Sequence, residues 1–74
     1  MARIFNPAIL RGNLRRLRVR AGLTQPQLAE QVGVTWSSIS GYECGKNVPP
    51  LVVLVRLADC LDCKLDELVL YEIR

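Results

Sequence analysis

The chain has 74 residues, half of them hydrophobic, with ten lysine and arginine residues against seven aspartate and glutamate residues. So short a chain holds one small domain, expected over residues 1–74, because it buries only about 60% of its unfolded surface. The hydrophobic content excludes a disordered segment. Histidine, the commonest general base and a frequent zinc ligand, is absent, so we expect neither an enzyme nor a bound cofactor.

The positive charge is unevenly distributed along the chain. Residues 1–50 hold seven basic and two acidic side chains, a net charge of +5, whereas residues 51–74 hold three basic and five acidic ones, a net charge of −2. Such a polarity suits a protein that meets a polyanion with one side. A solvated arginine face on the first helix would give the same pattern, and charge alone leaves both interpretations open.

Nothing in the sequence predicts a targeting or membrane segment. Residues 1–14 lack the apolar core of a signal peptide, and the longest aliphatic run, residues 51–55, is far too short to cross a bilayer. Three cysteines, an odd number, argue against a disulfide framework and favour a reducing compartment. We therefore expect a cytoplasmic protein.

The first predicted helix begins at Asn6-Pro7, because asparagine can cap a helix and proline is tolerated at the first helical position. It ends before Gly22, which suits a left-handed stop. Its apolar face consists of Leu10, Leu14 and Leu17.

Two short helices follow. Thr24 can cap the second helix, Gln27 completes a capping box, and Gly33 ends the helix. Thr35 can cap the third. The expected buried residues of the pair are Leu28, Ala29, Val32, Ile39 and Tyr42.

The last part of the chain begins with a loop over residues 44–50, which is rich in glycine and proline. A fourth helix is predicted from about residue 50 to residue 61, and a short fifth from about Leu65, burying Leu65 and Leu68. Residues 69–74 form a tail, where alternation is too weak to predict a strand. The sequence therefore predicts an all-α domain of five helices without a sheet.

Residues 25–43 have the spacing of a helix-turn-helix. Ala29 is small enough for two helices to cross, Gly33 accepts the positive φ of the turn, and Ile39 lies ten residues after Ala29. The apolar positions between them hold the helices at a fixed angle and leave one face of the second helix free. A generic helical hairpin that happens to satisfy the pattern is the alternative.

The run GLTQ..LA...GV....I..YE.G, starting at Gly22, resembles the Cro/repressor (XRE) helix-turn-helix family, and the resemblance extends over about residues 10–68. It implies a compact five-helix DNA-binding domain, usually dimeric, that regulates transcription in bacteria and phages. It also implies that residues 35–43 form the recognition helix, which enters the major groove. The implied contacts to bases or phosphates are Gln25, Gln27, Thr35, Trp36, Ser37, Ser40, Gly41, Lys46 and Asn47.

The recognition helix departs from the family where specificity should reside. Trp36 replaces the more usual polar residue, Gly41 offers no side chain, and no arginine, lysine, asparagine or glutamine is available to read guanine or adenine bidentately. Helical spacing nevertheless directs Trp36, Ser37, Ser40 and Gly41 outward. We therefore predict modest direct readout supplemented by DNA shape. Alternatively, Trp36 packs against a neighbouring protein.

Arg18 and Glu43 are two charged residues on apolar helix faces. Both would be forced inward unless they pair, and the family resemblance implies such a pair between the first helix and the recognition helix. A surface arginine and a surface glutamate are the alternative.

Cys60 and Cys63 have the C-x-x-C spacing of a metal or redox site. With no histidine and only one other cysteine, Cys44, the chain lacks four zinc ligands, so we favour core packing over metal binding.

The fourth helix and the tail carry more apolar residues than one core face requires. An apolar patch left on so small a monomer usually marks an interface. We predict a homodimer formed through Val52, Val53, Val55, Val69, Leu70, Tyr71 and Ile73.

Three functions fit the sequence. The first is a sequence-specific regulator of transcription, expected to be a repressor, that binds double-stranded DNA at a pseudo-palindromic operator. The second is an antitoxin or controller whose C-terminal half docks a partner protein. The third is a protein-interaction module that does not bind DNA.

Overall fold

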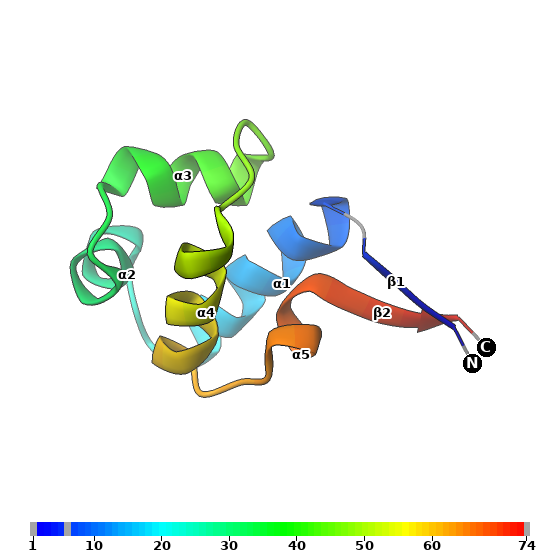
Figure 1. Ribbon diagram of the computed structural model, residues 1–74. Coiled ribbons are helices and arrows are strands. Elements are labelled where there is room, and N and C mark those ends of the chain that lie inside the picture. Colours follow the sequence, from blue (N-terminus) through cyan, green and yellow to red (C-terminus); the bar gives the residue numbers. More distant parts are fainter. Residues whose placement is uncertain (1, 6, 74) are drawn as a thin grey trace.

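The computed structural model describes residues 2–5 and 7–73 and has five helices flanked by two short strands (Figure 1). The five predicted helices are confirmed, and the domain is helical apart from the strands. In chain order the elements are β1 (Ala2–Phe5), α1 (Pro7–Arg20), α2 (Gln25–Val32), α3 (Trp36–Cys44), α4 (Leu51–Cys60), α5 (Leu65–Val69) and β2 (Leu70–Ile73).

The two ends of the chain pair as an antiparallel sheet. Ala2 lies opposite Ile73 and Phe5 opposite Leu70, and Figure 1 shows this ribbon projecting away from the helices. The expectation of no sheet was wrong here. Four-residue strands are too short to display clear alternation, and each finds its partner at the opposite end of the chain, where local sequence carries no information about pairing.

The helix boundaries follow the predicted caps. Thr24 accepts a hydrogen bond from the backbone N–H of Gln27, whose side-chain oxygen accepts one from the N–H of Thr24, so the capping box is complete. Gly22, the second residue after α1, and Gly33, directly after α2, both adopt positive φ, 75° and 81°. Thr35 caps α3 through the N–H of Ser38. The predicted cap at Asn6 lies outside the described residues.

One apolar core joins all five helices. The short α5 contributes Leu68, but Leu65 is 36% exposed, so its predicted burial was wrong. Leu65 is the first residue of the five-residue α5, whereas Leu68 lies one turn further along the helix and is buried. The buried core residues are Leu10, Leu14, Leu17, Leu28, Ala29, Val32, Ile39, Tyr42, Leu57, Ala58, Leu61 and Leu68.

α3 lies along one edge of the molecule. Figure 1 shows α3 running across the top of the view, with α4 in front of α1 and α5 on the opposite side from α3. Asn13 of α1 ties α5 in place, since its amide nitrogen donates to the carbonyl oxygens of Glu67 and Leu68 at 3.1 and 3.3 Å. Within residues 2–5 and 7–73, none of the helices combines the length and the apolar character that crossing a membrane would require.

Candidate nucleic-acid interface

The turn between α2 and α3 fixes the angle at which α3 leaves the domain. The backbone N–H groups of Gly33 and Val34 both donate to the carbonyl oxygen of Ala29, at 2.9 and 3.0 Å. Ala29 is itself buried in the core. Ile39 and Tyr42 anchor the inner face of α3 in the core, and the opposite face is left exposed, as the spacing predicted.

The exposed face of α3 carries one large aromatic residue and two hydroxyls. Trp36 is 60% exposed, and Ser37 and Ser40 are exposed beside it, so the predicted outward direction of these three is confirmed. The Thr35 hydroxyl is also at the surface, although it is engaged in the cap with Ser38. This face therefore offers an indole and short hydroxyl groups to a partner.

Gly41 does not lie on the exposed face, and its predicted outward position was wrong. It is buried beneath the side chain of Asn47, and a Cβ at Gly41 would lie 2.5 Å from the Asn47 amide nitrogen. The backbone N–H groups of Lys46 and Asn47 both donate to the Gly41 carbonyl, at 2.9 and 3.2 Å. The missing side chain thus lets the loop after α3 fold back onto the helix.

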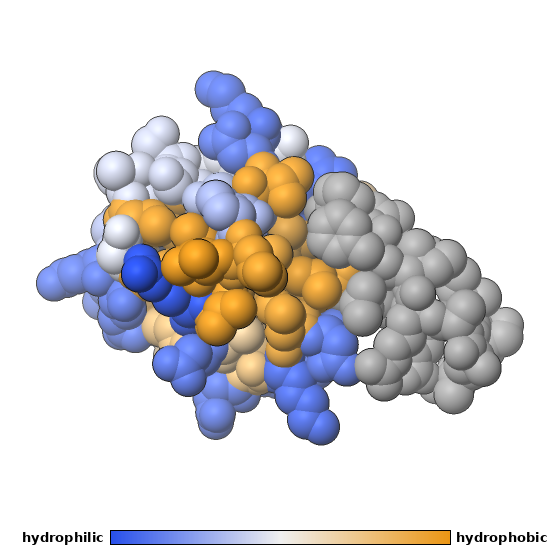
Figure 2. Space-filling view, viewed as in Figure 1, coloured by the Kyte–Doolittle hydropathy of each residue, from blue (hydrophilic) through white to orange (hydrophobic). Residues whose placement is uncertain are grey.

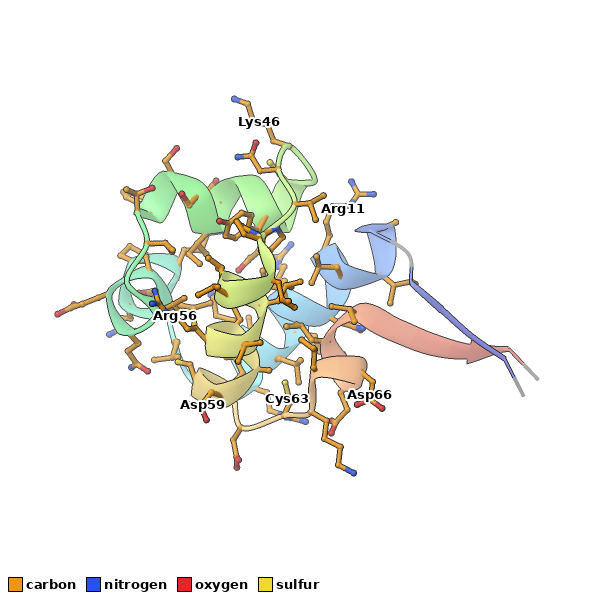
Figure 3. All side chains as sticks on the ribbon, viewed as in Figure 1. Arg11, Lys46, Arg56, Asp59, Cys63 and Asp66 are labelled. Atoms are coloured by element: carbon orange, nitrogen blue, oxygen red, sulfur yellow. The ribbon has the colours of Figure 1, made fainter. Side chains whose placement is uncertain are left out.

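The loop after α3 exposes Lys46 and Asn47 to solvent, and Figure 3 shows Lys46 on the α3 side of the molecule. Arg11 of α1 belongs to the same region, because its side chain packs against Gly45, the glycine that ends α3 with φ 81°. Gly45 leaves room for this arginine, which approaches the negative end of the α3 dipole. The sequence pattern did not single out Arg11, since only the fold brings α1 to this loop.

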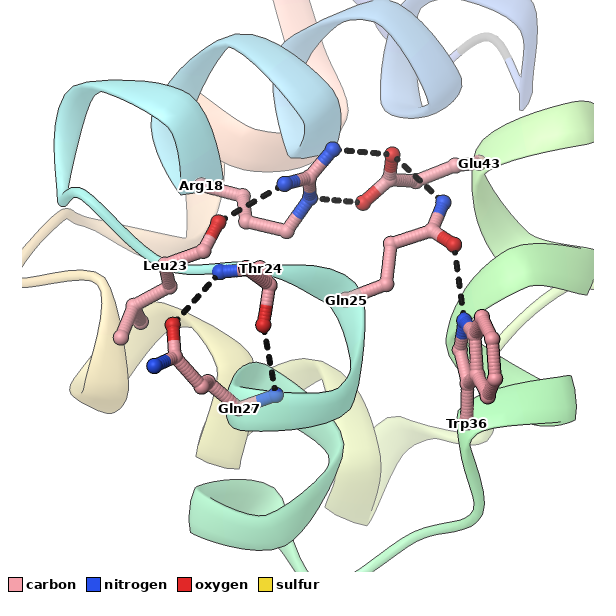
Figure 4. A network of polar contacts seen from close by, with 7 residues as sticks. All are labelled: Arg18, Leu23, Thr24, Gln25, Gln27, Trp36 and Glu43. Carbon is pink, nitrogen blue, oxygen red and sulfur yellow. Dashed lines mark hydrogen bonds and ion pairs between the residues drawn. The ribbon is translucent and has the colours of Figure 1, made fainter.

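Gln25 and Gln27 occupy the first turn of α2, where free backbone N–H groups attract anions. Gln27 is exposed, and its oxygen is committed to the capping box, so only its amide nitrogen remains for a partner. Gln25 is half-buried and lies between two side chains of α3 (Figure 4). It donates to Glu43 Oε1 at 3.2 Å and accepts from the indole nitrogen of Trp36 at 3.0 Å.

Arg18 and Glu43 form the predicted ion pair between α1 and α3. Arg18 Nε and Nη2 donate to the two Glu43 carboxylate oxygens at 2.6 and 3.1 Å, and Nη1 donates to the Leu23 carbonyl at 2.7 Å (Figure 4). The side chains are only 13% and 5% exposed. The pair therefore fixes α3 to α1 from inside the domain.

A polar hollow of about 260 Å³ opens between α1, α2 and α3. It adds two residues that sequence reasoning missed, Arg15 and Cys44, because each lies on a different helix from Gln25. Its lining residues are Arg15, Arg18, Gln25, Ser40, Glu43 and Cys44.

The charges are only partly sorted across the molecule, because Arg16 and Arg20 lie close enough to Cys63, on the acidic side, to act on its thiol. Figure 3 shows Lys46 and Arg11 toward the α3 edge, and Asp59 and Asp66 on the opposite side. The acidic half of the chain thus lies away from the exposed face of α3, which a polyanion could approach without repulsion.

The family model described as "Helix-turn-helix domain" matches residues 9–70, most of the chain. The protein belongs to this family. Its sequence is 47% identical over 53 residues to the uncharacterized HTH-type transcriptional regulator YobD of Bacillus subtilis, covering 72% of this chain and 47% of YobD. The chain spans about half or less of the length of the first curated relatives it matches.

Solved structures of this helix-turn-helix type superpose well on the chain. The restriction-modification controller protein C.AhdI from Aeromonas hydrophila is 35% identical with a TM-score of 0.79, over 84% of this chain and 94% of C.AhdI. The P22 c2 repressor protein, solved in complex with a synthetic operator, is 28% identical with a TM-score of 0.79, over 82% of this chain and 92% of the repressor structure. The Cro/repressor resemblance of the sequence is therefore confirmed.

The helix-turn-helix domain also exposes an apolar surface on α4, which faces the viewer in Figure 2. Val52 and Val55 lie on it as predicted, whereas Val53 and Val69 pack against the core and contribute less. The side chains of Leu70, Tyr71 and Ile73 lie outside the described residues. The exposed apolar residues here, two of them unforeseen, are Val48, Leu51, Val52 and Val55, and we call them the α4 patch.

Cys60 and Cys63 pack at the edge of the core, as predicted. Cys60 Sγ lies 2.9 Å from the oxygen of Gln31, to which it donates. Burial raises the pKa of both thiols, and the nearby carboxylates of Asp59 and Glu67 add to the effect at Cys60 and Cys63 respectively. Both thiols therefore stay protonated at neutral pH. No group of potential metal ligands occurs among the residues described.

Proposed function

We propose that this domain binds specific sites in double-stranded DNA and regulates transcription there as a repressor, without a cofactor and without catalytic activity of its own. The observation that carries the proposal is the exposed outer face of α3, with Trp36, Ser37 and Ser40, held rigidly by the Arg18–Glu43 pair. A helix fixed and exposed in this way fits the major groove. The place of action is the cytoplasm of a bacterial cell.

The residues around α3 divide into base-facing and phosphate-facing groups. Trp36, Ser37 and Ser40 would meet base edges, with Thr35 at the start of the helix. Lys46, Asn47, Gln27 and the α2 N-terminus would meet phosphates, and the exposed Arg11 and Arg15 extend this basic surface onto α1. Because serine accepts hydrogen bonds from several bases, DNA shape would supply part of the specificity.

We further propose that the domain acts as a two-fold dimer joined through the α4 patch. Val48, Leu51, Val52 and Val55 are all more than half exposed, which is costly for a monomer of this size. In Figure 1 α4 faces the viewer while α3 lies along the top, so a partner on α4 leaves α3 free for DNA. Two half-sites about 34–36 Å apart would then be read together.

Selection of bound duplexes from a random DNA pool tests the function directly. We expect one enriched sequence with two-fold symmetry, bound with an affinity that falls steeply with salt, since phosphate contacts release counterions. A protein that enriches no sequence and whose weak DNA binding is salt-independent would instead be an interaction module without DNA binding.

A controller role is the second candidate. It is favoured by the likeness to C.AhdI, which extends over 94% of that protein, whereas the match to YobD extends over only 47% of that regulator. A controller or antitoxin would use its C-terminal half to dock a partner protein. Purification from the native host separates the two candidates: a stoichiometric second protein that is released by Val55→Asp would favour the docking role.

A further inference from the structure

The only hydrogen-bond donor of the Trp36 side chain is used inside the protein. Its indole nitrogen donates to Gln25 Oε1 at 3.0 Å, although the residue as a whole is 60% exposed. An indole has a single N–H and no acceptor. While this bond persists, what Trp36 offers to DNA is an apolar aromatic surface.

The direction of the Gln25 amide is dictated by its other neighbour. Glu43 Oε1 is a carboxylate oxygen and can only accept, so the amide nitrogen of Gln25 must face it, at 3.2 Å. The amide oxygen is thereby turned toward Trp36. Arg18 holds the Glu43 carboxylate by two bonds, so the orientation is set from within the domain (Figure 4).

We propose that Trp36 recognises the 5-methyl group of a pyrimidine in the major groove, and that Gln25 is the residue that positions the indole for this contact. The inference rests on the proposed binding to specific DNA sites. In the major groove, thymine differs from cytosine partly by this methyl group, which is the only apolar feature among the base edges. An indole whose N–H is already hydrogen-bonded can contact that methyl group with its apolar ring, but it cannot form a hydrogen bond with a base edge.

The same contact would form with 5-methylcytosine. The methyl group occupies the same position on both pyrimidines, while the exocyclic group beside it changes from an acceptor to a donor. Since the indole has no free polar atom, it would tolerate this exchange. The ligand is therefore defined by the methyl group rather than by the base.

The test uses the duplex enriched by selection, with each thymine replaced in turn by deoxyuridine, which removes only the methyl group. We expect one thymine per half-site at which this change weakens wild-type binding about fourfold, the effect of one methyl group lost from an apolar contact. For Trp36→Ala the same two duplexes should bind equally. Placing cytosine at that position should weaken binding, and 5-methylcytosine should recover part of the loss.

A second variant separates positioning from phosphate binding. Gln25→Met keeps the length of the side chain but removes both hydrogen bonds, so we expect the thymine-to-uracil ratio to fall toward one. Loss of affinity shared equally by both duplexes would mean that Gln25 only contacts phosphate, and would overturn its positioning role. In the free protein, the single indole N–H resonance should shift and exchange faster with water in Gln25→Met, and remain unchanged in Gln27→Met.

The possible failures are distinguishable. If no site is enriched, the proposed function is refuted and this inference falls with it. If a site is enriched but every deoxyuridine duplex binds like its thymine counterpart, or Trp36→Ala keeps the wild-type ratio, the function stands and the methyl contact is refuted. Unchanged DNA binding by Trp36→Ala together with loss of self-association would assign Trp36 to a protein interface.

Discussion

Glu43→Ala is the substitution that most directly probes how α3 is held. In the wild type the Glu43 carboxylate accepts from Arg18 Nε, Arg18 Nη2 and Gln25 Nε2, and its side chain is 5% exposed. The alanine variant removes all three acceptor contacts at once. Arg18 keeps only its bond to the Leu23 carbonyl and becomes a largely buried charge without a counterion.

The expected cost follows from this geometry. Breaking a buried ion pair by removing one partner costs about 3–5 kcal/mol, because the remaining charge stays desolvated. Arg18 is 13% exposed and retains one carbonyl partner, which places the estimate at the lower end, about 3 kcal/mol. For a domain of this size each kcal/mol lowers the melting temperature by about 4–8 °C, so Tm should fall by more than about 10 °C.

Thermal unfolding followed by circular dichroism measures the effect, with Glu30→Ala as the matched control. Glu30 lies on the exposed side of α2, and its loss should change stability by less than about 0.5 kcal/mol. A double variant, Arg18→Met with Glu43→Leu, removes both charges and should recover much of the lost stability. Small and equal losses in Glu43→Ala and Glu30→Ala would refute the view that this pair is buried and stabilising.

Three further substitutions or modifications test other parts of the structure. Gly41→Ala should change stability by less than about 1 kcal/mol, because the gain in helix propensity offsets the displacement of the Asn47 side chain. The variant should nevertheless bind specific and random DNA duplexes more weakly to the same extent. A loss of affinity for the specific site alone would contradict a phosphate-binding role for this loop. Val55→Asp, in the middle of the α4 patch, should shift the protein from dimer to monomer in sedimentation at micromolar concentration, whereas Val19→Asp, at an equally exposed valine of α1, should not. Iodoacetamide at pH 7 should alkylate the exposed Cys44 before Cys60 and Cys63, because the raised pKa of these two thiols keeps them protonated. Peptide mass spectrometry measures the order of alkylation, and the reverse order would contradict the packing of the two thiols.

The parts of the fold that local chemistry dictates could be predicted from sequence. The capping box at Thr24 and Gln27 and the left-handed glycine at Gly33 each depend on residues within a few positions, so their signals were visible without the fold. The Arg18–Glu43 pair was also predictable, because each charge falls on an otherwise apolar helix face and has no other way to be neutralised.

The errors arose where distant parts of the chain meet. Helical periodicity directed Gly41 outward, but it could not anticipate that the following loop would fold back and cover it with Asn47. Arg11 and Arg15 were missed for the same reason, since their places beside Gly45 and in the polar hollow depend on how α1 crosses α3. The terminal sheet pairs residues from the two ends of the chain, which no local pattern connects.

The connection from Arg18 through Glu43 and Gln25 to Trp36 runs from the interior of the domain to its surface, and the cost of altering it should decrease along that path. Glu43 is nearly fully buried, Gln25 is half-buried, and Trp36 is mostly exposed. A hydrogen bond lost at the surface is replaced by water, whereas one lost inside leaves a group unsatisfied. Position 36 can therefore vary, and the base preference with it, at little cost to stability. Position 43 cannot vary in this way, because the orientation of every outer member of the network depends on it.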